Sequence, residues 1–102
     1  MRKNNFRTLE IAVAFYQKSR QIQIPGHLKA QLVRAAASVA LNLSEGRGRM
    51  SRKDQVRFFH IALGSVRECQ AVLILENLQT SQAWRVLDHL AASLYRLIQN
   101  AR

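Results

Sequence analysis

Residues 41–55 read LNLSEGRGRMSRKDQ, and they separate two long segments whose apolar residues recur with helical spacing. The stretch holds two glycines, one glutamate and a group of arginines. Gly46 stands where the first segment can end in a glycine cap, and Ser51 stands where the next can begin. Asp54, three residues after Ser51, completes an acidic variant of the capping box. We therefore interpret residues 41–55 as the corner between two helices.

Around this corner and through the rest of the chain, four segments show helical rather than alternating periodicity. Pro25 biases the preceding residue away from helix and Gly26 permits a turn, which separates the first two segments. Because the connections are short, they predict an all-α, up-down-up-down antiparallel four-helix bundle, a single domain over residues 1–102. The expected helices cover residues 6–21, 27–45, 51–78 and, after a cap at Thr80 or Ser81, most of the remaining chain.

The apolar stripes predict which face of each helix is buried. On the first helix the expected inner stripe is Phe6, Leu9, Val13 and Tyr16, with Ala12 beside them. The third and fourth helices carry apolar residues over more than one face. On the fourth, the second stripe is Val86, Leu90 and Leu97. Such a stripe indicates either a subunit interface or a wide core-facing surface.

The charge of the chain is strongly positive. Sixteen Lys and Arg oppose six Asp and Glu, giving a formal net charge of +10. That balance favours a polyanionic partner, first nucleic acid and second an anionic membrane surface. No apolar run approaches the ~18 residues of a membrane span, and Cys69 is the single cysteine. We therefore expect no disulfide framework or thiolate zinc site, no membrane partner and a cytoplasmic location.

The corner does not fit a phosphate-binding loop of the Walker type or a dinucleotide fingerprint, because its glycines are wrongly spaced and a helical segment precedes it. Its cations can still contact phosphate beside the positive end of the third helix. The alternative is a solvated basic corner. We assign nucleic-acid contact to Arg47, Arg49, Arg52, Lys53 and Arg57. A structural role at the corner is assigned to Arg34, Asn42, Glu45 and Gly46, with Glu45 pairing with Arg49 or Arg57.

No catalytic residue, metal site or cofactor is predicted. His27, His60 and His89 lie on three different segments, without carboxylates at metal-ligand spacing. The runs RFFH at 57–60 and RVLDH at 85–89 resemble the arginine-to-histidine motif of helical ribonucleases of the HEPN class, although both gaps are shorter than usual. A ribonuclease therefore remains a third hypothesis.

Two longer runs carry a family resemblance. LVRAAASVALNLSEGRGR, from residue 32, and RFFHIALGSVRECQ, from Arg57, are similar to the small bacterial four-helix bundle proteins linked to ribosomal RNA intervening sequences. The opening FRTLE, residues 6–10, is also similar to the start of that family. The resemblance implies a ring-shaped homopentamer without catalytic activity. Related proteins are accessory factors of diversity-generating retroelements, where a basic barrel binds a reverse transcriptase and nucleic acid.

These observations leave three functions. The first is a non-enzymatic, homo-oligomeric bundle that binds RNA or DNA through phosphate contacts, with a reverse transcriptase as a further partner. The second is a scaffold or adaptor whose basic surface docks an acidic protein. The third is the helical ribonuclease. Salt dependence of nucleic-acid binding discriminates the first from the others.

Overall fold

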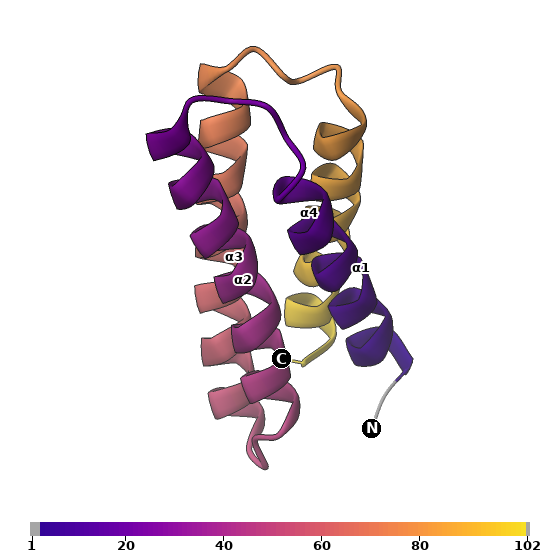
Figure 1. Cartoon of the computed structure of the whole chain (residues 1–102). Coiled ribbons are helices and arrows are strands. Elements are labelled where there is room, and N and C mark those ends of the chain that lie inside the picture. The colour runs from indigo at the N-terminus through magenta and orange to yellow at the C-terminus, as the bar shows by residue number, and fades with distance from the viewer. Residues whose placement is uncertain (1–2, 102) are drawn as a thin grey trace.

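The structure is a computed structural model that describes residues 3–101, with the side chains of residues 6–101. It confirms the four-helix bundle (Figure 1). Each helix packs against the helices before and after it, α1 packs against α4, and the diagonal pairs make no such contact. This is the up-and-down arrangement expected from short connections. The helices are α1 (Lys3–Ser19), α2 (Gly26–Arg47), α3 (Arg52–Leu75) and α4 (Gln82–Ala101).

The ends of the helices follow from individual side chains. Ser51 Oγ accepts a hydrogen bond from the backbone N–H of Asp54 at 3.1 Å, and Ser81 Oγ accepts one from that of Trp84 at 3.1 Å. Both serines are therefore N-caps, and the choice between Thr80 and Ser81 is settled. Pro25 stands immediately before α2 in an extended conformation, which suits a residue that cannot donate a backbone hydrogen bond.

Helix α3 ends at Leu75, three residues earlier than the sequence predicts. Asn77 adopts a left-handed conformation, with φ of 58°. Its N–H bonds to the carbonyl of Ile74, and the N–H of Leu78 bonds to the carbonyl of Leu73 at 2.9 Å. This is a Schellman motif with asparagine in the usual glycine position. Leu73 and Leu78 both pack on the core, so the apolar pattern continues although the helix does not.

The core is built mainly from large apolar residues of α2, α3 and α4, joined by few from α1. Leu90 and Leu97, expected in a second stripe of α4, are buried, and Val86 packs partly against the core. That stripe therefore faces the core, which decides between the two alternatives for α4. The largest fully buried apolar side chains are Phe15, Phe59, Leu32, Leu43, Leu73, Leu87, Leu90 and Leu94.

The predicted inner face of α1 is confirmed for Ala12 and in part for Leu9 and Tyr16, but it is wrong for Phe6 and Val13. Phe6 is 48% exposed and Val13 is 42% exposed, whereas the buried residues of α1 are Thr8, Ala12, Phe15 and Ser19. Thr8 reaches α4, where its Oγ1 lies 2.6 Å from Ser93 Oγ in a buried hydrogen bond. The helix is therefore rotated so that Phe15 faces inward together with small and hydroxyl-bearing residues. This leaves large apolar side chains on the surface.

Helix α3 is the one described helix that is long and apolar enough to cross a membrane by length and composition alone. In the bundle it packs against α2 and α4 and supplies several buried residues, including Phe59, Val66 and Leu73. Its apolar character is thus explained by its place in the core. Ile61, Ile74 and Leu75 nevertheless remain exposed on its outer side.

Candidate nucleic-acid interface

The corner between α2 and α3 reaches past the last turn of α4 at the lower end of the bundle (Figure 1). Helix α2 ends at Arg47, Gly48 caps it, and Met50 is fully exposed at the turn. Five cationic and two acidic side chains lie between residues 45 and 57, which gives this segment a net charge of +3. The corner is thus an exposed cationic projection.

Gly46 does not have the role predicted for it. It lies inside α2, is buried, and the structure shows no glycine with positive φ among the described residues. A Cβ at Gly46 would lie 2.8 Å from Phe59 Cε1 and 3.1 Å from Phe58 Cβ. Glycine is therefore needed because α3 approaches α2 closely here, whereas Gly48 takes the capping position with φ of −83°.

Arg49 and Arg57 form a stack with one aromatic ring. The guanidinium carbons of Arg49 and Arg57 lie 4.8 Å and 4.5 Å from the centroid of the Phe58 ring. Such cation–π contacts hold guanidinium groups in place without neutralising them. Arg49 Nη2 also bonds to Glu45 Oε2 at 2.8 Å, and Arg57 Nε lies 3.7 Å from Asp54 Oδ1. Glu45 thus pairs with the first of its two predicted partners.

Arg52 and Lys53 are exposed in the first turn of α3, and the structure gives them no ion pair among the described residues. They stand beside the unpaired backbone N–H groups and positive end of that helix. Ser51 uses one of these groups, the N–H of Asp54. The exposed cations and the helix end together suit an anion such as a backbone phosphate.

Arg47 is folded back on the bundle. Its guanidinium carbon lies 5.4 Å from the centroid of the Phe6 ring on α1, and its Nε is buried. Of the five predicted phosphate contacts, Arg47 is thus the least extended into solvent. The packing of its side chain links the N-terminal part of α1 to the end of α2.

Two residues assigned to the corner act elsewhere. Asn42 Nδ2 donates to the carbonyl of Ser38 at 2.9 Å and contacts Ser38 Oγ at 3.1 Å, and that hydroxyl lies 2.9 Å from Ser65 Oγ. Asn42 therefore joins a polar contact between α2 and α3, one turn before the corner. Arg34 is exposed on α2, about 18 Å along the helix from Gly46 at 1.5 Å per residue. The corner role assigned to Arg34 is therefore wrong.

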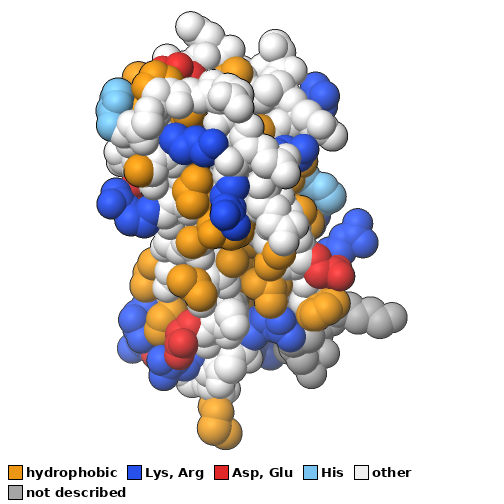
Figure 2. Space-filling model, in the orientation of Figure 1, with side chains coloured by type: hydrophobic (Ala, Val, Ile, Leu, Met, Phe, Trp, Pro, Cys, Tyr) orange, Lys and Arg blue, Asp and Glu red, His pale blue; other side chains and the backbone are white. Residues whose placement is uncertain are grey.

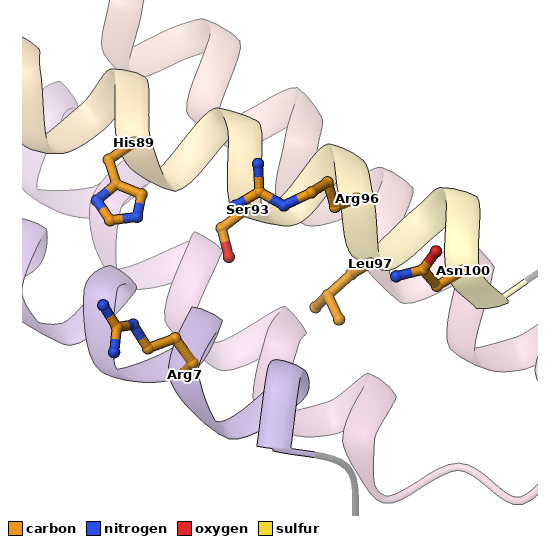
Figure 3. Close-up of a pocket in the computed structure, with 6 residues that line it drawn as sticks. All are labelled: Arg7, His89, Ser93, Arg96, Leu97 and Asn100. Carbon is orange, nitrogen blue, oxygen red and sulfur yellow. The ribbon is translucent and has the colours of Figure 1, made fainter.

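The structure also shows two surface features that no local sequence motif indicates. An apolar groove of about 280 Å³ lies between α1 and α2 and is lined by Val13, Tyr16, Ala37, Ala40 and Leu41. Figure 2 shows hydrophobic side chains following this line, with Lys and Arg beside them. The second feature is a basic pocket between α1 and α4 (Figure 3). Both join residues from separate helices, so only the correct rotation of α1 would have revealed them.

The histidines do not gather into a site. Among the described residues, no group of three His, Cys, Asp or Glu is placed to hold a metal ion. His89 lines the basic pocket together with Arg7 and Arg96. The neighbouring Arg85 instead donates to the carbonyl of Thr80 at 3.3 Å. Within RVLDH, the arginine and the histidine therefore have different surroundings.

Comparison with known proteins agrees with the resemblance carried by the corner and the start of α3. No curated protein and no solved structure matches the chain significantly. The sequence model of one family, described as 23S rRNA-intervening sequence protein, matches residues 7–100, which covers all four helices. The chain belongs to the 23S rRNA-intervening sequence protein family.

Proposed function

We propose that the protein is a non-enzymatic, cytoplasmic, homo-oligomeric bundle that binds nucleic acid through phosphate contacts at the α2–α3 corner. The observation that carries this proposal is the exposed pair Arg52 and Lys53 at the N-terminus of α3, beside the stacked guanidinium groups of Arg49 and Arg57. The description of the family names ribosomal RNA, which is compatible with a nucleic-acid partner, RNA or DNA. Few aromatic side chains are exposed, so base stacking contributes little and phosphate contact dominates.

The test is a binding titration of RNA, single-stranded DNA and duplex DNA across a salt series. Each phosphate contact contributes about 0.7 to the log–log salt slope for single strands and about 0.9 for duplex DNA. Arg52→Gln combined with Lys53→Gln should therefore lower the slope by roughly 1.4 or 1.8. The matched control is Arg67→Gln with Arg85→Gln, which removes the same charge from exposed positions on α3 and α4. An equal change in both variants would contradict contact at the corner.

Self-association is the second part of the proposal. Leu41, which is 69% exposed, lines the α1–α2 groove together with the exposed Val13. Ile74 and Leu75 are exposed on α3. Apolar surface of this kind on a small soluble domain favours contact with another subunit. The family resemblance implies a ring of five, and the mass of the assembly in solution tests that number directly.

The second candidate is an adaptor that docks a partner protein such as a reverse transcriptase. The observation that favours it is the same α1–α2 groove, because an apolar surface with cations beside it suits an acidic amphipathic segment. An adaptor should bind nucleic acid only at the non-specific level and its partner tightly. Corner variants should then leave the binding of the partner unchanged.

A further inference from the structure

The basic pocket between α1 and α4 lies on the side of the bundle opposite the α2–α3 pair, and its volume is about 180 Å³. A single water needs about 10–15 Å³ of such space, so the pocket has room for a tetrahedral anion. Its lining is Arg7 from α1 with His89, Ser93, Arg96, Leu97 and Asn100 from α4.

The pocket is cationic and contains no carboxylate. Arg7 and Arg96 are exposed and form no ion pair within the described part of the chain. The acids nearest in sequence, Glu10 and Asp88, are not among the lining residues. Figure 3 shows Arg7 reaching from α1 towards His89, while the side chain of Arg96 runs back along α4 towards Ser93. Two arginines that line one hollow without a carboxylate repel each other, and a bound anion would offset that repulsion.

The walls of the pocket are fixed by the core. The buried hydrogen bond of 2.6 Å between Thr8 and Ser93 holds α1 against α4 at the position where Arg7 enters. Leu97 and Ser93 are almost fully buried and close the inner side. The small Ser93 leaves the space that a longer side chain would fill. The hollow is therefore a feature of the packed bundle and does not depend on a mobile loop.

We propose that this pocket binds a phosphate that carries two negative charges, as in a phosphomonoester. Each guanidinium offers a planar fork that matches two phosphate oxygens, and Asn100 and His89 add further hydrogen-bonding groups. An internal phosphodiester carries one negative charge and continues as a chain on both sides. Because the pocket is closed on its inner side, it suits a phosphate at the end of a ligand. The ligand is the terminal phosphate of a nucleic-acid strand or a free mononucleotide. This site stands independently of the α2–α3 corner.

The first arm of the test titrates inorganic phosphate into isotopically labelled protein at constant ionic strength, with chloride as the reference anion. Phosphate should shift the amide signals around Arg7, Ser93 and Arg96 with a dissociation constant of about 1 mM, as two charge-assisted contacts give. Arg7→Gln should weaken binding about tenfold, and Asn100→Asp should abolish it by adding a negative charge. Arg67→Gln removes one exposed charge outside the pocket and should bind normally. Shifts no larger than those with chloride overturn the proposal.

The second arm distinguishes the two sources of phosphate. If a 5′-phosphorylated RNA decamer binds tighter than its 5′-hydroxyl counterpart, and Arg96→Gln removes this difference, the ligand is the terminal phosphate of a strand. Equal binding of both decamers, together with tighter binding of adenosine monophosphate than of adenosine, identifies a mononucleotide. Absence of both preferences overturns the proposal. If Arg52→Gln combined with Lys53→Gln abolishes the binding of 5′-hydroxyl RNA but leaves the phosphate titration unchanged, the result bears on the α2–α3 corner and not on the pocket.

Discussion

Alanine should have opposite effects at two glycines of the α2–α3 pair. At Gly46 the new Cβ would lie 2.8 Å from Cε1 of Phe59, a ring that is 1% exposed and cannot move aside without disturbing the core. At Gly64, in the middle of α3, nothing lies within 4 Å of the new Cβ. The same substitution therefore tests helix propensity alone at one position and close packing at the other.

The two magnitudes follow from separate terms. Replacing glycine by alanine inside a helix stabilises the fold by about 0.8–1 kcal/mol, which is the whole expected effect at Gly64. At Gly46 the same gain is offset by overpacking, which costs about 1–3 kcal/mol. The expected net result is destabilisation by about 1 kcal/mol at Gly46 and stabilisation by about 1 kcal/mol at Gly64. The variants should then melt roughly 8–16 °C apart.

Urea unfolding followed by circular dichroism measures both free energies, and the mass of each variant should be measured under the same conditions. Equal stabilisation by the two substitutions would refute the close approach of Phe59 to Gly46. Destabilisation by Gly64→Ala would refute the open surface at that position. If this destabilisation depended on protein concentration, it would show that another subunit covers Gly64.

Three further outcomes are expected. Burial raises the pKa of the Cys69 thiol from 9.0 to about 12, so the thiol should react with a thiol reagent only when the protein unfolds. Above about pH 9 only the unfolded chain loses this proton, so the contribution of Cys69 to the free energy of unfolding should fall there. Thr8→Val should lower the free energy of unfolding, measured in urea, by about 1 kcal/mol. This is the lower end of the cost of leaving a buried hydroxyl unpaired, because Ser93 borders the pocket and water there can replace Thr8 as its hydrogen-bond partner. Leu41→Glu should leave the unfolding transition cooperative while reducing the assembly mass, since Leu41 is exposed in the monomer; an unchanged mass contradicts self-association through the α1–α2 groove.

The sequence predicts the fold well because the break between α1 and α2 and the starts of α3 and α4 carry local signals. Ser51 and Ser81 cap α3 and α4 as expected, and Pro25 separates α1 from α2. The end of α3 is missed because Asn77 adopts the left-handed conformation while the apolar pattern continues to Leu78. A periodic pattern of apolar residues indicates which positions are buried, and buried positions can continue for several residues beyond the end of the helix.

The rotation of α1 could not be predicted because side-chain size misleads there. Phe6 and Val13 are more apolar than Thr8 and Ser19, yet the hydroxyl-bearing residues face inward. The reason lies on α4, where Ser93 provides a buried partner for Thr8 at a sequence separation of 85 residues. The basic pocket was missed for the same reason, since Arg7 joins Arg96 only after this pairing fixes the two helices.

The corner shows the same limit at shorter range. Arg52 lies in the first turn of α3, whereas Arg47 folds back onto Phe6 of α1. In the structure the guanidinium groups of Arg49 and Arg57 both lie over the Phe58 ring. These two contacts offset part of the repulsion between the like charges. Part of the cost of assembling a cationic surface is thus met by the fold before any ligand binds.

Phe6 connects α1 to the end of α2, next to the corner on which the proposed function rests. Its ring is 48% exposed on α1, and the guanidinium of Arg47, the last residue of α2, lies over it. If a second subunit covers the exposed side of α1, Phe6 loses freedom and Arg47 is held more firmly on it. The last turn of α2 and the corner that follows would then be ordered before nucleic acid arrives. Assembly and binding would then favour each other, because the first would remove an entropic cost of the second.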